Sequence, residues 1–273
     1  MSVVTSARRA VIRAGNSTWL EVLTRIGLAG YGVLHLAVAW LAVQIAIGRP
    51  ATEGDQSGAF RVLVAQPLGQ VLVWVIAIGL VAMALWQLIE AAVGHLDDRG
   101  TRRIVERAVS FARTVIYLAL AVTAYRVVSG APTSNAAQQQ KATAGLLGWP
   151  AGPWLVGLVG VIVTAVGLVV AAYGIRKEFE KRLKRSQMRR RTRSALVLAG
   201  QIGYAVKGLA YAIVGVLLVV AAVAYDPGRS TGLDGALRTL ATRPFGELLL
   251  LTVALGLAVF GVYCFGQARY RKV

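Results

Sequence analysis

The sequence predicts an all-α integral membrane protein with six transmembrane helices, arranged as three tandem two-helix repeats. Apolar residues make up 56% of the 273 residues before the 30 glycines are added, whereas soluble domains average about 45–50% with glycine included. Several apolar runs are long enough to cross a bilayer, which takes about 20 residues. One pattern of glycine, tyrosine and positively charged residues also occurs three times along the chain.

The repeated pattern is clearest in residues 200–225, GQIGYAVKGLAYAIVGVLLVVAAVAY, an apolar run that contains one cation, Lys207. It returns in residues 24–43, TRIGLAGYGVLHLAVAWLAV, and in residues 107–126, RAVSFARTVIYLALAVTAYR. Because the same features recur at matching positions, each copy should form the first helix of one repeat. The matching positions in the three copies are Gly27, Val109 and Gly203; Tyr31, Arg113 and Lys207; Gly32, Thr114 and Gly208; and His35, Tyr117 and Tyr211.

The first repeat is expected to cover residues 18–97. Residues 1–17 carry arginines and no acid, which predicts a basic cytosolic tail. Thr18 is followed three residues later by a glutamate, the spacing of a capping box, which predicts a helix start. The first span should then run from about residue 26 to residue 47, and the second should cover residues 67–93.

Two short segments outside the spans match each other. Residues 58–69, GAFRVLVAQPLG, and residues 235–246, GALRTLATRPFG, both lead through an apolar stretch with an arginine into proline, an apolar residue and glycine. This pattern predicts an amphipathic turn that lies at the membrane interface. Pro67 and Pro244 should stand at or near the first turn of the following span, where a missing N–H costs little.

The middle repeat is expected to cover residues 98–193, with spans over about residues 105–128 and 150–175. Residues 129–149 are polar and rich in turn formers, which predicts an outer loop. Residues 176–193 carry ten Lys or Arg and two Glu. Such a segment beside a span end is attracted to an anionic leaflet by about 1 kcal/mol per cation.

The third repeat is expected to cover residues 194–273. Its first span begins near Leu196, an outer loop covers residues 225–243, and its second span covers residues 245–267. Of the 30 Lys and Arg residues, 22 fall on the side of the two termini, seven fall on the opposite side, and Lys207 lies within a span. Because cytosolic loops carry the excess of cations, this bias places both termini in the cytosol, in a multi-pass protein of the bacterial cell (inner) membrane.

The repeated units resemble a known family. The two glycines of GYAVKG with a cation before the second, the doubled proline–glycine segment and the three two-span units are similar to the family called domain of unknown function 1206. Its members are bacterial membrane proteins, common in actinobacteria, and the resemblance covers about residues 20–270. The third copy fits best, since Tyr31 replaces the cation in the first copy, and Val109 and Thr114 replace glycines in the second. The family has no established activity, so the resemblance implies no catalytic or binding residues.

Lys207, Arg113 and Tyr31 are the candidate lipid or anion contacts. If the three copies pack around a pseudo-three-fold axis, these equivalent positions could face one another near the cytosolic end. A charge within a span is expensive and marks a candidate functional site. Three interpretations are open for the cations: long side chains that reach the headgroup region, an anionic lipid headgroup held between spans, or a transported anion.

Glu90, Gln87 and His35 are the other candidate polar residues of the membrane interior. Glu90 with Gln87 could handle protons or cations, or Glu90 could pair with a loop arginine such as Arg102 or Arg103. Two separated histidines without acids or thiols at ligand spacing predict no metal site, and no cofactor is expected. His35 should therefore be a packed ring with one hydrogen bond.

Glycines within the spans should let helices approach closely, and the candidates for helix packing are Gly27, Gly32, Gly203 and Gly208. No strand precedes them, which excludes a glycine-rich phosphate loop. The one cysteine, Cys264, can form neither a disulfide framework nor a zinc site.

These features predict a non-enzymatic scaffold or accessory subunit that binds anionic phospholipid headgroups, another membrane protein or a second copy of itself. No serine–histidine–acid or cysteine–histidine set is readable, which argues against an enzyme. The net charge of +18 would suggest nucleic acid in a soluble protein, but these cations lie in short loops without interleaved aromatic residues. The alternative is a small transporter or channel, which usually carries a polar site on broken helices at the bilayer midplane. Apolar span centres favour the scaffold.

Overall fold

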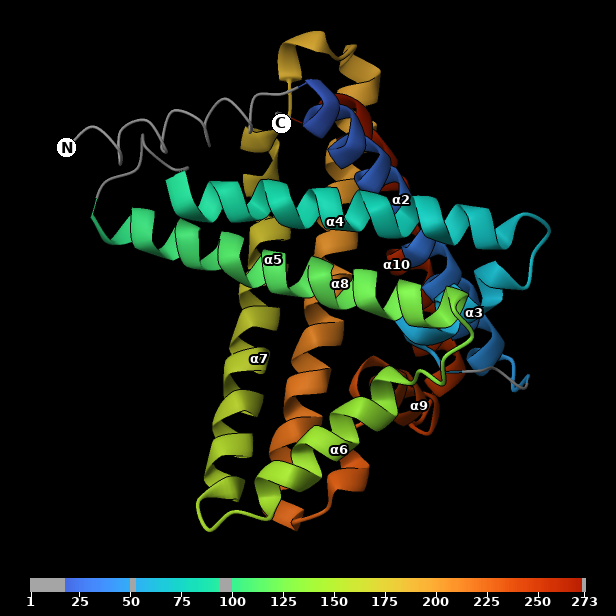
Figure 1. The fold of residues 1–273 in the computed structure, drawn as a ribbon, viewed down its shortest axis with the longest axis vertical. Helices are drawn as coiled ribbons and strands as arrows, with labels where there is room; N and C mark the ends of the chain where they lie inside the picture. The colour runs from blue at the N-terminus through green and yellow to red at the C-terminus, as the bar shows by residue number, and fades with distance from the viewer. Residues whose placement is uncertain (1–17, 50–52, 94–99, 272–273) are drawn as a thin grey trace.

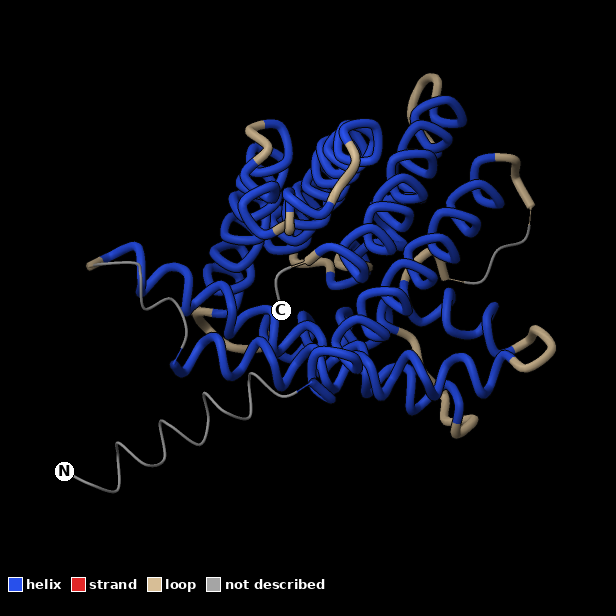
Figure 2. The backbone as a smooth tube through the Cα atoms, turned by 90° about the horizontal axis from the view of Figure 1, so that it is seen from above, coloured by secondary structure: helices blue, strands red, loops and turns tan. Residues whose placement is uncertain are grey.

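The computed structural model describes residues 18–49, 53–93 and 100–271. These ranges contain helices and loops and no β-strand (Figure 2). The expected basic tail, residues 1–17, and the second histidine, His95, lie outside the described residues. Six helices are long and apolar enough to cross a membrane, as the sequence predicted. They are α2 (Thr18–Ala46), α4 (Gly69–Val93), α5 (Thr101–Val128), α7 (Gly152–Ile175), α8 (Arg190–Ala224) and α10 (Gly246–Tyr270).

Each repeat also has a short helix between its two long ones: α3 (Gln56–Val64), α6 (Asn135–Leu147) and α9 (Gly232–Ala241). α3 and α9 occupy the two segments that were expected to be amphipathic interfacial turns. The expectation of a loop over residues 129–149 was wrong, because this range contains α6. Alanine and glutamine favour helices, and the Ser134 hydroxyl caps the start of α6 by accepting a hydrogen bond from the N–H of Ala137.

The turn that follows each short helix has the same construction in all three repeats. The N–H groups of Gly69, Gly152 and Gly246 each donate to the carbonyl three residues earlier at 2.8 Å. A Cβ atom at any of these glycines would overlap a carbonyl oxygen of the preceding short helix. Only glycine fits, which explains why the proline–x–glycine pattern recurs. Pro67 and Pro244 stand two residues before the next long helix.

The six long helices pack in one open row, in the order α5, α4, α2, α10, α8, α7. In Figure 1, α4 and α5 run across the view and α7 and α8 run down it, and α2 and α10 join the two pairs. We call α4 with α5 the first arm and α7 with α8 the second arm. α5 and α7 belong to the same repeat but make no extended contact with each other along their described lengths. The middle repeat is therefore open, whereas α2 packs on α4 and α8 packs on α10.

Glycines set the contacts within the closed repeats. Gly27 lies against Gly79 between α2 and α4, and Gly203 lies against Phe260 between α8 and α10. The equivalent residue in the middle repeat is Val109, which is 37% exposed. Glycine lets two helix backbones approach closely and valine does not. This difference accounts for the separation of α5 from α7.

The other two packing glycines join neighbouring repeats. Gly32 of α2 lies against α10, and Gly208 of α8 lies against Gly167 of α7. At this position the middle repeat has Thr114, whose hydroxyl donates to the carbonyl of Ala84 in α4 at 3.5 Å. The first helix of each repeat thus packs on the second helix of another copy, and these three junctions are all closed.

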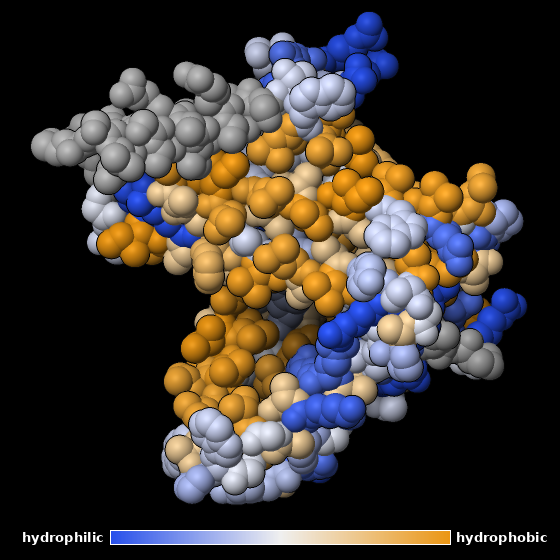
Figure 3. All heavy atoms as spheres, in the orientation of Figure 1, coloured by the Kyte–Doolittle hydropathy of each residue, from blue (hydrophilic) through white to orange (hydrophobic). Residues whose placement is uncertain are grey.

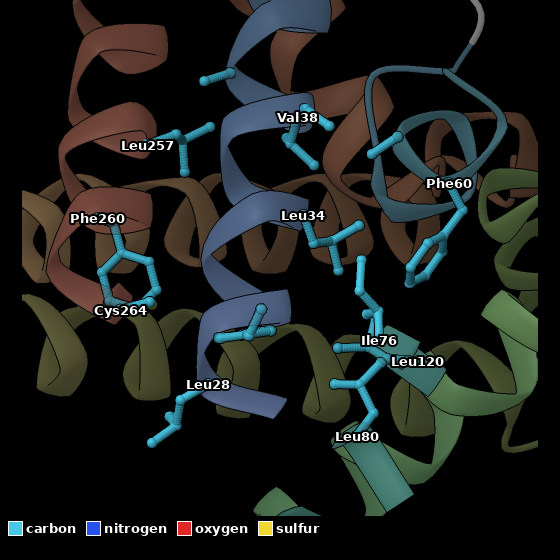
Figure 4. Close-up of a cluster of buried hydrophobic side chains, with 14 of the residues drawn as sticks. Leu28, Leu34, Val38, Phe60, Ile76, Leu80, Leu120, Leu257, Phe260 and Cys264 are labelled. Atoms are coloured by element: carbon cyan, nitrogen blue, oxygen red, sulfur yellow. The ribbon is translucent and has the colours of Figure 1, made fainter. Parts of the chain in front are cut away.

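The apolar core lies where the first arm meets α2 and α10. Leu34 of α2, Ile76 of α4 and Leu257 of α10 are buried there, and Phe60 brings α3 onto the same cluster (Figure 4). In a bilayer, helix association is driven by close packing and hydrogen bonds and not by the release of water. Interdigitation of these side chains, together with the glycine contacts, therefore holds the bundle together.

The three short helices gather at one end of the bundle, at the lower right of Figure 1, and we call them the outer cap. Asp234 of α9 accepts a hydrogen bond from the N–H of Gly54 at 2.7 Å and forms an ion pair with Arg238 at 2.9 Å. Arg61 of α3 donates to the carbonyl of Thr133, just before α6, at 2.5 Å. The outer segments of all three repeats are thereby linked.

The start of α2, the end of α10 and the basic segment after α7 meet at the other end of the bundle. Arg25 donates to the carbonyls of Ala268 and Arg269 at 2.6 and 2.7 Å. Lys184 forms an ion pair with Glu21 at 3.7 Å. Because the outer cap and this end lie at opposite ends of the six long helices, the fold agrees with six crossings.

Reporter domains fused after Ser134, in the outer cap, and after Arg185, in the basic segment, should report opposite sides of the membrane. The cation bias predicts that the first is outside the cell and the second is in the cytosol. An alkaline phosphatase and green fluorescent protein pair would show this, since each is active on one side only. If both positions report the same side, the six-span arrangement is wrong.

The surfaces of both arms are apolar. Figure 3 shows hydrophobic residues over α4 and α5 and over α7 below them, with a hollow between the two. α7 buries the smallest share of its residues among the six long helices. These helices lie in contact with the lipid bilayer, and the exposed apolar residues of α7 include Trp154, Leu158, Val161, Ile162, Leu168 and Val169.

Candidate functional site

Lys207 lies at the centre of the molecule, between α2, α8 and α10. Its ammonium group is 2.7 Å from the hydroxyl of Tyr31, its equivalent in the first repeat. It also lies 4.3 Å from the ring centre of Phe260 and 5.7 Å from that of Tyr211. The side chain is directed into the bundle, so the interpretation in which it extends to the headgroup region does not describe Lys207.

His35 is buried beside this lysine, one helical turn after Tyr31. Its Nδ1 atom is 2.8 Å from the carbonyl oxygen of Tyr31. Because a carbonyl can only accept, Nδ1 is assigned the hydrogen. The ring packs on Tyr31 and on Phe260 with centroid distances of 4.3 and 4.8 Å. His35 is thus a packed histidine with one hydrogen bond, in agreement with the expectation.

Arg113, the third equivalent residue, faces the second arm from α5. Arg182, Arg271 and Tyr204 are close enough to interact with it electrostatically. It is close enough to Lys207 for the two cations to repel each other. Arg113 is half-buried and makes no hydrogen bond or ion pair with any residue that the structure describes.

Arg271 completes a group of three arginines, with Arg113 and Arg182, that we call the inner cation cluster. It is 5% exposed and its guanidinium lies 4.7 Å from the ring centre of Trp86 in α4. Its Nε atom is buried without a hydrogen-bond partner in the described part of the chain. An isolated β-bridge to Leu183 fixes its backbone at the end of α10.

The cation cluster carries more positive charge than the neighbouring carboxylates can neutralise. Arg182 pairs with Glu106 of α5 at 3.1 Å. Within the described ranges, no carboxylate lies at ion-pair distance from Lys207, Arg113 or Arg271. A buried charge is costly unless it is paired. The planar guanidinium fork suits the oxygen atoms of a phosphate or carboxylate, so an anion is the kind of ligand that matches the charge of this cluster.

Gln87 and Glu90 lie near the end of α4. Gln87 is 1% exposed, and its Nε2 atom has no hydrogen-bond partner among the described residues. Glu90 is half-buried. Among the described residues, no group of three or more His, Cys, Asp or Glu could hold a metal ion.

The sequence identified one of the three arginines of the cluster. Arg113 was a candidate because it lies within a span, whereas Arg182 and Arg271 were assigned to a basic loop and to the C-terminal tail. Nothing in local sequence shows that a tail arginine is buried against Trp86. The sequence contained only an indirect indication of the cluster. The predicted topology placed the end of α10, the basic segment and the start of α5 on the same side of the membrane.

The sequence matches one family along most of its length. The family described as Domain of Unknown Function (DUF1206) matches residues 26–94, 108–177 and 202–271, one match in each repeat. The chain is also 29% identical over 265 residues to the uncharacterised protein YxxB of Bacillus subtilis strain 168, covering 96% of this chain and 95% of that protein. No solved structure matches the chain.

Proposed function

The chain belongs to the Domain of Unknown Function 1206 family of multi-pass membrane proteins, and we propose that it is a non-enzymatic membrane scaffold that binds an anionic phospholipid. The headgroup phosphate would contact Arg113 and Arg271, and the acyl chains would lie along the open middle repeat. Both termini would lie in the cytosol, which places the site in the inner leaflet.

The unpaired arginines of the inner cation cluster carry this proposal. Arg113 and Arg271 are buried or half-buried, lie near each other and have no carboxylate partner among the described residues. An isolated cation in a membrane interior is expensive and usually pairs with an anion. Inner-leaflet lipids supply such anions at high local concentration.

The open middle repeat supports a lipid as the source of that anion. α5 and α7 make no extended contact along their described lengths, and the surfaces of both arms are apolar. A soluble anion would also meet the charge requirement, but both arms beside the opening face the lipid bilayer, whose inner leaflet supplies anionic phospholipid directly. A phospholipid matches both the charge and the apolar surfaces, because its headgroup is charged and its chains are apolar.

Replacing Arg113 and Arg271 by glutamine should reduce the anionic lipid that is purified with the protein. Native mass spectrometry after extraction in a mild detergent measures the number and class of bound lipids. The fold should persist, because the substitution removes a desolvation cost together with an attraction. Thermal stabilisation by added anionic lipid should shrink by RT ln(1 + [L]/Kd) for the lost site.

Arg126→Gln combined with Arg269→Gln is the matched control, because it removes the same charge from two exposed arginines, one on α5 and one in the last turn of α10. The control should keep the bound lipid. Equal lipid retention in both double variants would contradict the proposal. Anion flux in liposomes that the Arg113 and Arg271 variant abolishes would favour a transporter instead.

A further inference from the structure

A second, separate feature lies beside Lys207, on the side towards the outer cap. The cavity there has a volume of about 10 Å³. Its walls include Lys207 and Tyr211 of α8, His35 of α2 and Gln56 of α3. A space of this size holds one water-sized species. In the part of the chain that the structure describes, the cavity is therefore of a size that suits one small species.

Lys207 brings the largest number of hydrogen-bond donors to this cavity, while the Nε2 atom of His35 and the side-chain oxygen of Gln56 can accept. An ammonium group has three donors and no acceptor. One donor of Lys207 is engaged by the Tyr31 hydroxyl, and no other hydrogen bond of its ammonium group is found among the described residues. Tyr211 also lines the cavity, and its hydroxyl can donate one hydrogen bond. The Gln56 amide can add two further donors.

Aromatic rings surround the ammonium group of Lys207 but do not neutralise its charge. Phe260, Tyr31 and Tyr211 place their faces towards the ammonium group at 4.3, 4.8 and 5.7 Å. Cation–π contacts are worth about 0.5–2 kcal/mol and add no negative charge. Glu53 and Asp55, the acids nearest in sequence to Gln56, are engaged by Arg61 and by Ser57, respectively.

We propose that the cavity beside Lys207 binds one small inorganic anion of halide size, which enters from the side of the outer cap. The ammonium group supplies the charge, and the hydroxyl of Tyr211 and the amide of Gln56 supply donors. The site differs from the lipid site in location and in the size of its ligand, so either can exist without the other.

Bromide is the probe, because it can replace chloride and is visible by anomalous X-ray scattering. Crystals of the full-length chain grown in sodium bromide should show an anomalous peak in this cavity, next to the ammonium group of Lys207. A cavity that contains only water, with no anomalous peak, would overturn the proposal.

Thermal unfolding of the purified protein gives an independent measurement. At equal ionic strength, sodium bromide and sodium chloride should raise the unfolding temperature above its value in sodium gluconate, since gluconate is too large for the cavity. Lys207→Met should lose this difference. Lys141→Met, which changes an exposed lysine on α6, should keep it.

The variants separate the possible results. If Lys207→Met still responds to halide, the ion binds elsewhere and the proposal fails. If Lys207→Met does not fold, the anomalous peak in the unaltered protein decides the question. Loss of bound lipid in the arginine variants does not decide this question, because neither Arg113 nor Arg271 lines the cavity.

Discussion

Replacing Gly208 with leucine is expected to separate α7 from α8 and to lower the unfolding temperature by many degrees. A Cβ atom at Gly208 would overlap the backbone of Ala171 and of Gly167. Backbone atoms in the middle of two helices cannot move aside as a side chain can. Overpacking of this kind costs about 1–3 kcal/mol even where side chains can adjust. Here the two helices must move apart. The free energy of unfolding should therefore fall by an amount at or above the top of that range.

The consequence should be large because α7 has no other long helix to hold it. Its extended contact is with α8, and it makes a smaller one with α6. Thermal unfolding in detergent and the elution profile on size exclusion would measure the loss. Gly145→Leu is the control, since a Cβ at Gly145 meets nothing within 4 Å. Equal stability of the two variants would show that the α7–α8 contact is not as described.

Replacing Asp234 with alanine should open the outer cap. Asp234 is 7% exposed and connects α9 of the third repeat to Gly54 of the first. Its removal leaves the buried N–H of Gly54 without its acceptor. Hydrogen bonds to charged groups contribute about 1.5–3 kcal/mol, so a destabilisation of that order is expected. The segment before α3 should also become sensitive to protease added from the outer side.

Asp226→Ala provides the comparison for this experiment. Asp226 is exposed and pairs only locally with Arg229, three residues away. Exposed ion pairs contribute about 0–1 kcal/mol, so this variant should behave as the unaltered protein. If Asp234→Ala is equally stable and equally resistant to protease, the three outer segments do not hold one another.

The fold could be predicted from the sequence because its main patterns repeat along the chain. Spans follow from the length of apolar runs, and the proline–x–glycine turns follow from the steric need for glycine at Gly69 and Gly246. α6 was missed because its glutamines make it look like a polar loop. Its equivalence to α3 and α9 becomes clear only when Gly152 is seen to stand where those two glycines stand.

Contacts between distant parts of the chain were the harder part. The equivalence of Tyr31 and Lys207 suggested that they could meet, and their side chains do. The open middle repeat was not predicted, although Val109 was recognised as a lost glycine. Without that glycine, α5 and α7 lack the close backbone contact that Gly27 makes with Gly79 between α2 and α4. Arg271 was missed because burial of a tail residue depends on tertiary packing.

A structure of the unaltered protein in nanodiscs that contain phosphatidylglycerol would show whether the open middle repeat holds an anionic lipid on unpaired arginines. We expect a headgroup phosphate in contact with the guanidinium groups of Arg113 and Arg271, and acyl-chain density along α5 and α7. Direct packing of α5 on α7, with both arginines paired to carboxylates of the protein, would contradict it.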